Sequence, residues 1–512
     1  MQASAALPGP YVLGLDGGTE GLRVGLIDPE GRPVAFVRES YATTHAHAGW
    51  AEQRPDDWWQ AAVRGIRRIL ADTGVAPAAI VGAALGCTSY TLVCSDAAGR
   101  PVRPALLWMD VRSREEAKAV AASGQECLRY SGGRGSAEWM PAKALWLRRH
   151  EPETWAATTW VSDYVEWMGF RLTGERAASV NSAAIRCYYD RLLGGWPDGL
   201  FDVLGLGDLG ARLAPRVLAM GDVVGGLSAR AAEETGLLAG TPVAQGGADA
   251  FVGMVGLGVV APGSVALITG SSHLHLLQTD VPSYSSEVFG AYSDAVVPGQ
   301  FTVEGGQAST GSVVNWFARL LGGGVPLAEL SEAAGRVPPG SEGVMALDYW
   351  QGNRTPHVDA DARGMFWGLS LHHERAHLFR ALLESVCFGT ENVLRSMRAQ
   401  GHDIRDMVAC GGAVNSRVWM QMHADVSGTA IRTTQVPEAV TLGAAILAAT
   451  GAGLHASVAE ASRAMVRTAE VVEPDLDVTE QYRPHLELYL DSYRAMQPLM
   501  HRSAELAHAA RR

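Results

Sequence analysis

Two glycine-rich turns, each set between two apolar strands, lie about half a chain apart in this sequence of 512 residues. The first unit runs from Tyr11 to Asp28 and the second from Val265 to Leu277. Both patterns predict β-hairpins, with tight turns at Gly17-Gly18-Thr19 and at Gly270-Ser271-Ser272. A hairpin that recurs at this spacing predicts two domains of related topology that face each other.

The remainder of the chain alternates strand and helix patterns, which is typical of α/β architecture. A helix is predicted from Pro55 to Thr73, with proline at its first position and Gly74 after its end. The uncharged stretch from Ala250 to Ser272 has the length of a membrane span, but its glycines and Pro262-Gly263 interrupt it. We therefore predict a buried helix, a turn and a strand there, and domains of residues 1–258 and 259–512.

Composition restricts the class of partner. A net charge of −12 without a run of five like charges argues against a nucleic-acid or membrane surface and favours a small molecule. The six cysteines are scattered, lack CxxC spacing and are predicted to be reduced core residues. No secretory signal pattern opens the chain, so we expect a cytoplasmic protein.

The two hairpin tips could bind phosphate groups. Gly17-Gly18-Thr19 offers backbone N–H groups and a hydroxyl, with Arg23 as counter-charge and Asp16 placed to hold Mg²⁺. One such hairpin alone could equally be a tight turn. The second tip, with Thr269 and Ser271, favours a polyphosphate that bridges two domains.

Asp249 is an acidic residue among small and apolar neighbours, directly after a strand pattern at 243–245. It could cap the helix that starts at Ala250, because an aspartate accepts hydrogen bonds from the first backbone donors of a helix. It could also be a general base that takes the proton of an attacking hydroxyl. The two roles are compatible.

A competing motif is His373-Glu374-Arg375-Ala376-His377, whose HExxH spacing places two imidazoles on one helix face, as in zinc enzymes. Its polar surroundings, however, are those of a solvated first turn. The sequence therefore favours an ordinary helix start over a zinc site.

Three stretches combine side chains that can form hydrogen bonds to hydroxyl groups with an aromatic residue or glycines. Together they suggest recognition of a polyol. They are Thr88-Ser89-Tyr90, Trp108-Met-Asp110-Val-Arg112 and Glu304-Gly-Gly-Gln307. Each alone could be ordinary loop packing, and Asp110 with Arg112 could form a surface ion pair.

In order and spacing these motifs resemble the FGGY carbohydrate kinases over almost the whole chain. The resemblance implies two RNase-H-like domains of the actin-like ATPase superfamily that flank a catalytic cleft. It implies Asp249 as catalytic base, Asp16 and Asp249 at Mg²⁺, and Thr88, Ser89, Trp108, Asp110, Arg112, Glu304 and Asp249 at the sugar. It implies an ATP site at Gly17, Gly18, Thr19, Arg23, Thr269, Gly270, Ser271, Gly311, Asn315, Gly411, Gly412 and Ser416.

Thr88-Ser89 and Glu304-Gly-Gly-Gln307 are similar to the ribulokinase-type branch, which implies ATP-dependent phosphorylation of a ketopentose such as ribulose. Xylulose, erythritol and glycerol are the alternative acceptors. The alternative from another functional class is an actin-like ATPase that hydrolyses the nucleotide as a conformational switch and has no sugar acceptor. Whether the protein forms a homodimer stays undecided, because no interface leaves a recognisable pattern in the sequence.

Overall fold

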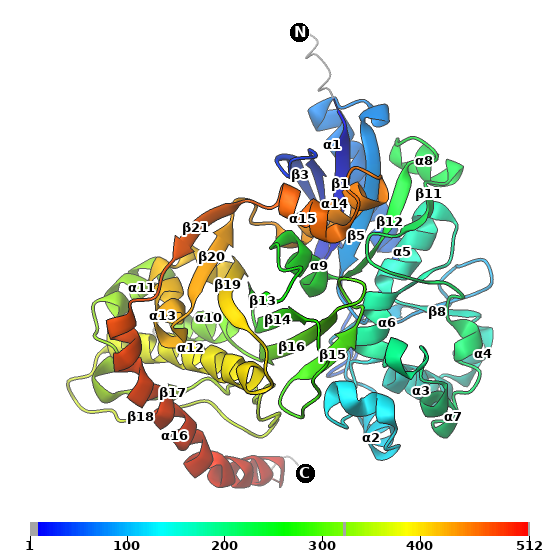
Figure 1. Cartoon of the computed structure of the whole chain (residues 1–512). Coiled ribbons are helices and arrows are strands. Elements are labelled where there is room, and N and C mark those ends of the chain that lie inside the picture. The colour runs from blue at the N-terminus through cyan, green and yellow to red at the C-terminus, as the bar shows by residue number, and fades with distance from the viewer. Residues whose placement is uncertain (1–8, 321–323, 510–512) are drawn as a thin grey trace.

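The computed structural model describes residues 9–320 and 324–509, and its strands form two large sheets, one in each lobe of Figure 1. The sheet of the N-terminal lobe contains, from edge to edge, β11 (Val223–Gly226), β12 (Pro242–Ala248), β5 (Ile80–Cys87), β1 (Tyr11–Gly17), β2 (Gly21–Ile27) and β3 (Pro33–Ser40). The sheet of the C-terminal lobe contains β15 (Phe289–Ser293), β16 (Phe301–Gln307), β14 (His273–Thr279), β13 (Gly263–Thr269), β19 (Ile404–Gly411), β20 (Ala430–Thr434) and β21 (Thr468–Val472).

The two sheets share one topology. In the first, β1, β2 and β3 form an antiparallel meander, and β5 and β12 continue it as parallel strands. In the second, β13, β14 and β16 form the same meander, and β19 and β20 are the parallel strands. The predicted duplication is therefore confirmed, and the hairpin tips after β1 and β13 occupy equivalent positions.

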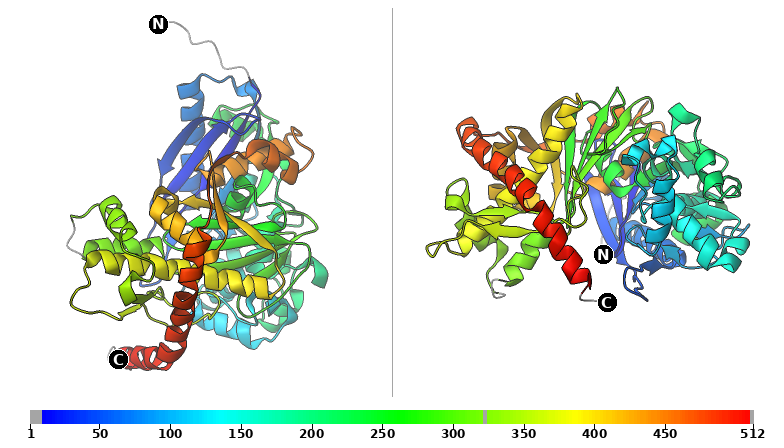
Figure 2. Two further views of the ribbon diagram at one scale, coloured as in Figure 1. Left: turned by 60° about the vertical axis from the view of Figure 1, so that its left-hand side comes forward. Right: turned by 90° about the horizontal axis from the view of Figure 1, so that it is seen from below.

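Helices cover both sheets. In the N-terminal lobe they are α1 (Pro55–Thr73), α2 (Arg114–Ala122), α3 (Met140–His150), α4 (Pro152–Ala157), α5 (Tyr164–Thr173), α6 (Val180–Cys187), α7 (Asp198–Val203), α8 (Ala229–Thr235) and α9 (Asp249–Gly256). The later ones are α10 (Gly311–Leu320), α11 (Leu327–Gly335), α12 (Arg375–Ala399), α13 (Arg417–Ser427), α14 (Ala439–Gly451), α15 (Val458–Met465) and α16 (Leu476–Ala509). The long helix α16 runs along the outside of the C-terminal lobe (Figure 2).

Short two-stranded pairs complete the inventory. They are β4 (Glu52–Gln53) with β7 (Ala105–Leu106), β6 (Val93–Ser95) with β8 (Trp160–Ser162), β9 (Ala178–Ser179) with β10 (Val217–Leu218), and β17 (Met345–Leu347) with β18 (Met365–Trp367).

Helix α14 comes from the second half of the chain but packs against β1, β5 and α9 of the first lobe (Figure 1). The approach requires glycine on both sides. A Cβ at Gly14 of β1 would overlap the Thr441 carbonyl, and a Cβ at Gly443 would overlap the Val252 carbonyl of α9. The strands thus divide near the expected junction at residue 258, while one later helix pair, α14 and α15, returns to the N-terminal lobe.

Local predictions for several segments are confirmed. The helix expected at 55–73 is α1, and Gly74 follows it with φ of +65°. The uncharged stretch at 250–272 contains most of α9, a turn and strand β13, as expected. No helix within residues 9–320 and 324–509 is both long and apolar enough to cross a bilayer. All six cysteines are buried and unpaired.

Candidate active site

A cavity of about 240 Å³ lies where the two lobes meet. Both hairpin tips border it, together with the start of α9 and loops from each half of the chain. Its lining residues are Gly18, Thr19, Thr88, Ser89, Trp108, Glu138, Arg186, Ala248, Asp249, Ala250, Phe251, Ser271, Ser272, Leu274 and Arg354. A wider opening of about 590 Å³ continues from it past Trp139 and Phe289.

Asp249 is the first residue of α9, and it faces this cavity while protein surrounds its other sides. Burial, and after it repulsion from the Asp16 carboxylate, raises the pKa of Asp249 to about 7. The capping role weighed from the sequence is corrected, because Ala248 is the N-cap residue. Among the described residues, the Asp249 carboxylate accepts one hydrogen bond, from the N–H of Ala250 at 2.7 Å. This leaves the carboxylate available to a ligand.

The first hairpin brings Asp16 and Arg23 together across β1 and β2, with an ion pair of 3.0 Å. Burial raises the pKa of Asp16 above its usual range, although Arg23 acts in the opposite direction. The carbonyls of the tip are held from behind: the Tyr41 hydroxyl donates to Gly18 O at 2.5 Å and the Gln53 amide to Thr19 O at 2.6 Å. The tip is therefore fixed before any ligand binds.

The second hairpin contributes Ser271 and Ser272 to the cavity, but Thr269 is different. The Thr269 hydroxyl donates to Cys410 O at 2.6 Å and accepts from Ala413 N at 3.1 Å, so it links β13 to the turn after β19 and is not free at the tip. Its assignment to direct phosphate contact is corrected to a supporting one. Gly311, the first residue of α10, packs so closely on the Gly270 carbonyl that a Cβ would overlap it.

The residues expected at the adenosine end lie on the C-terminal lobe. Gly411 has φ of +95°, Gly412 borders open space, and the Ser416 hydroxyl caps α13 by accepting from Trp419 N at 3.3 Å. Asn315 lies exposed on α10. These residues are presented on one lobe, but none of them lines the cavity at Asp249.

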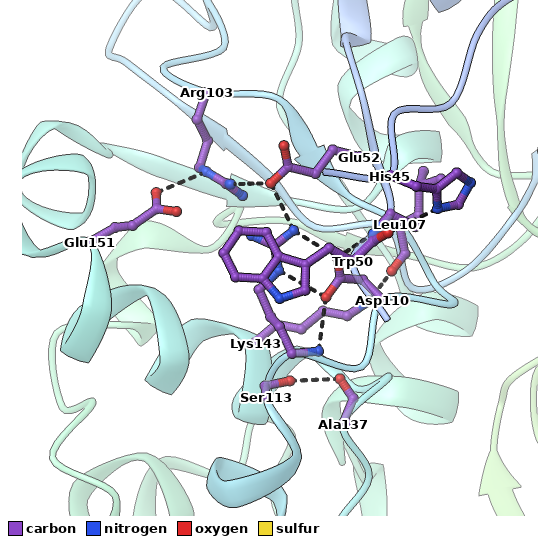
Figure 3. Close-up of polar contacts among 12 residues, drawn as sticks. His45, Trp50, Glu52, Arg103, Leu107, Asp110, Ser113, Ala137, Lys143 and Glu151 are labelled. Carbon is purple, nitrogen blue, oxygen red and sulfur yellow. Dashed lines mark hydrogen bonds and ion pairs between the residues drawn. The ribbon is translucent and has the colours of Figure 1, made fainter. Parts of the chain in front are cut away.

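Of the polyol loops, Thr88, Ser89 and Trp108 line the cavity, whereas Asp110 and Arg112 do not. Asp110 is fully buried and accepts from Ala51 N at 2.7 Å and from Arg112 Nη2 at 2.8 Å (Figure 3). The pair is thus an internal ion pair behind the cavity wall rather than a surface pair or a direct sugar ligand. The expectation of sugar contact by these two side chains is corrected.

Glu304 also lies behind the lining. Its carboxylate pairs with Arg186 at 3.0 Å and with Arg354 at 2.9 Å, and these two guanidinium groups face the cavity. Burial alone would raise the pKa of Glu304, but the two arginines outweigh it and hold the pKa below its usual range. Glu304 therefore acts as an ionised anchor for Arg186 and Arg354 at the site.

The sequence reasoning missed Glu138, Arg186 and Arg354, which supply the charged part of the lining. One signal was present for Arg186, since it is a charged residue within the buried stretch Val180–Cys187. Glu138 and Arg354 carry no comparable signal, because each lies in a loop whose position only the assembled lobes define.

The HExxH stretch forms the start of α12, as favoured from the sequence. Glu374 is the N-cap residue, and His377 Nδ1 accepts the Glu374 N–H at 3.0 Å. An imidazole that accepts at Nδ1 carries its proton on Nε2 and so cannot offer that nitrogen to zinc. Among the described residues, no group of three or more metal-binding side chains comes together.

Two duplicated lobes with a partly buried carboxylate between their hairpin tips are the arrangement expected of a phosphotransferase of the actin-like ATPase architecture. Residues 11–256 match the N-terminal domain, and residues 265–452 the C-terminal domain, of the FGGY family of carbohydrate kinases. The chain belongs to this family, and it is a sugar kinase.

Individual relatives agree with this assignment. The chain is 30% identical over 508 residues to a ribulokinase from Geobacillus thermodenitrificans, covering 90% of each chain. It is 27% identical to a xylulose kinase from Bacillus subtilis, covering 94% of this chain and 96% of that one. A crystal structure of xylulose kinase from Rhodospirillum rubrum, 28% identical, superposes with a TM-score of 0.86 over 96% of this chain and all of that one.

Proposed function

We propose that this sugar kinase transfers the γ-phosphoryl group of ATP to the terminal hydroxyl of a ketopentose, with ribulose as the favoured acceptor. The observation that carries the proposal is the position of Asp249 in the small cavity between the two hairpin tips. Its pKa of about 7 makes it a base poised near neutral pH, able to accept the proton that the attacking hydroxyl loses.

The chain's own residues suit a Mg²⁺–nucleotide complex. Mg²⁺ takes hard oxygen ligands and is commonly held by one or two protein carboxylates together with phosphate oxygens. Asp16 and Asp249 supply two such carboxylates, close enough for the charge of one to raise the pKa of the other. When bound, MgATP supplies the transferable phosphoryl group, and Gly18, Thr19 and Ser271 orient it.

The sugar end of the cavity supports a polyol acceptor. Glu138 can accept hydrogen bonds from hydroxyl groups, Arg186 can donate to a hydroxyl or ketone oxygen, and Trp108 offers an apolar wall. A volume of about 240 Å³ lies below that of pockets for drug-sized ligands, which favours a monosaccharide. The buried Glu304 holds Arg186 in place, so the donor is preorganised.

Ribulose is favoured because a ribulokinase is the relative with 30% identity reported above, and because the Thr88-Ser89 loop lines the cavity. Xylulose is the second candidate, since a xylulose kinase is 27% identical and the solved xylulose kinase shares the fold over nearly the whole chain.

The test is sugar-dependent ADP release, measured by a coupled assay across both enantiomers of ribulose and xylulose, with erythritol and glycerol. We expect the highest kcat/KM with a ribulose, and loss of turnover in Asp249→Asn with retained MgATP binding. A preference for xylulose or glycerol would refute the ribulose assignment. ATP hydrolysis that no sugar stimulates would instead favour the ATPase switch.

A further inference from the structure

Trp108 contacts both the proposed sugar pocket and the proposed phosphate-binding hairpin. Its ring lines the cavity, and its indole Nε1–H donates a hydrogen bond to Thr19 Oγ1, at the tip of the first hairpin, with a length of 3.2 Å. Thr19 is otherwise held through its backbone, since the Gln53 amide donates to its carbonyl at 2.6 Å. In the described part of the chain, Trp108 is thus the side chain that forms a hydrogen bond with the Thr19 hydroxyl.

The direction of this hydrogen bond determines how the Thr19 hydroxyl is oriented. An indole N–H can donate but has no lone pair to accept, so Thr19 Oγ1 must be the acceptor. The Thr19 hydroxyl hydrogen is then turned away from Trp108, and in the described part of the chain no acceptor for it is recorded. Because Thr19 borders the cavity beside Asp249, that hydrogen is available to an oxygen of the transferred phosphoryl group.

The turn that carries Trp108 is held by a buried polar network, and Figure 3 shows the part of it around Leu107, Asp110 and Lys143. The ammonium of Lys143, which is fully buried, donates to Leu107 O at 2.6 Å and to Tyr90 O at 2.8 Å. Asp110, two residues after Trp108, fastens the turn to the residue just before β4 by accepting from Ala51 N at 2.7 Å. The turn that carries Trp108 is therefore anchored on both sides of the indole.

We propose that Trp108 is a positioning residue for phosphoryl transfer: through its N–H it orients the Thr19 hydroxyl so that this hydroxyl donates to the transferred phosphoryl group. The inference rests on the proposed function, which places that group at the first hairpin. It adds a role for Trp108 beyond that of a wall for the sugar, and it makes the sugar pocket and the phosphate hairpin parts of one rigid unit.

The experiment is a double-mutant cycle with Trp108→Phe and Thr19→Val. Phenylalanine keeps an aromatic wall but removes the N–H together with part of the ring area, and the cycle isolates the N–H because the lost area is common to both backgrounds. We expect kcat to fall about tenfold while KM for the sugar stays nearly unchanged. Thr19→Val should lower kcat on the order of a hundredfold, because a donor to the transferred group is lost. In the Thr19→Val background, Trp108→Phe should cost nothing further.

Equal losses from Trp108→Phe in both backgrounds, or a rise in sugar KM as the main effect, would overturn the proposal, since Trp108 would then act only by packing. Trp196→Phe, in which the ring packs on Tyr189 away from the cavity, is the matched control and should behave as the wild type. Thermal melting of each variant reports folding.

A second readout separates this inference from the choice of sugar. MgATP affinity is measured by calorimetry without sugar for the same four proteins of the cycle. We expect Trp108→Phe to weaken MgATP binding when Thr19 is present, and to leave it unchanged in the Thr19→Val background. That pattern would support the inference even if ribulose proves the wrong acceptor, and additive weakening would contradict it.

Discussion

The pKa of Asp249 gives a pH profile that can be worked out in advance. A base must be deprotonated to act, and a pKa of about 7 leaves about a tenth of the carboxylate ionised at pH 6 and about nine tenths at pH 8. We therefore expect kcat/KM for the sugar, measured with MgATP well below saturation, to rise about tenfold per pH unit below 7 and to level off above it. An ordinary aspartate would give a flat profile over this range.

Asp249→Asn provides the second half of this prediction. The substitution should lower kcat about a thousandfold, within the range for loss of a general base, while MgATP still binds. It should also raise the melting temperature at pH 8. A carboxyl group whose pKa is raised on folding contributes stability that is present below pH 4 and lost as the pH rises through 7, and asparagine removes that loss.

Three measurements decide this reasoning. Kinetics at pH 5.5 to 9 give the profile, calorimetry gives MgATP affinity, and thermal melting gives the stability difference at pH 4 and pH 8. A profile with no inflection near pH 7, or an Asn variant within tenfold of the wild-type rate, would refute Asp249 as the base. A folded variant that binds no MgATP would instead show that the Asp249 carboxylate is needed to hold Mg²⁺.

Further predictions concern the support of the site. Lys143→Met leaves the Leu107 and Tyr90 carbonyls unpaired, so chemical denaturation should show a loss of about 2 kcal/mol, with a higher sugar KM. Gly411→Ala should lower the free energy of unfolding by about 3 kcal/mol, because its Cβ would overlap the Thr269 carbonyl. Gly412→Ala places its Cβ in open space, so the melting temperature should stay unchanged while KM for ATP rises. Arg186→Met should raise the sugar KM more than tenfold and lower the melting temperature, because a hydrogen bond to a charged group is lost and Glu304 stays buried with one partner fewer. Unchanged kinetics in the Arg186 variant would contradict its place at the sugar.

The sequence by itself determined the repeated unit of the fold. Alternating apolar residues around Gly17-Gly18-Thr19 and Gly270-Ser271-Ser272 specify hairpins, because glycine permits the tight turn and the apolar runs pair locally. The helix at Pro55–Thr73 was predictable to the residue, since its apolar positions recur at the helical period and Gly74 ends it. Asp249 stood out as a charge among small residues.

The charged lining of the site was decided by the tertiary structure alone. Arg186, Glu304 and Arg354 are separated by 50 residues or more in the chain, and their ion pairs exist only once α6, β16 and a later loop meet. No local period marks such a contact. The sequence likewise singled out Asp110 and Glu304 but placed them at the sugar, because a motif reveals a residue type and not the direction of its side chain.

The packing of the lobes shows the same division. Gly14 and Gly443 read as ordinary glycines in a strand and a helix, yet each is required where α14 crosses onto the first sheet. The sequence determined the elements, since secondary structure follows from the period of burial along a short segment. Only the tertiary structure decided which half of the chain completes each lobe, because that depends on surfaces hundreds of residues apart.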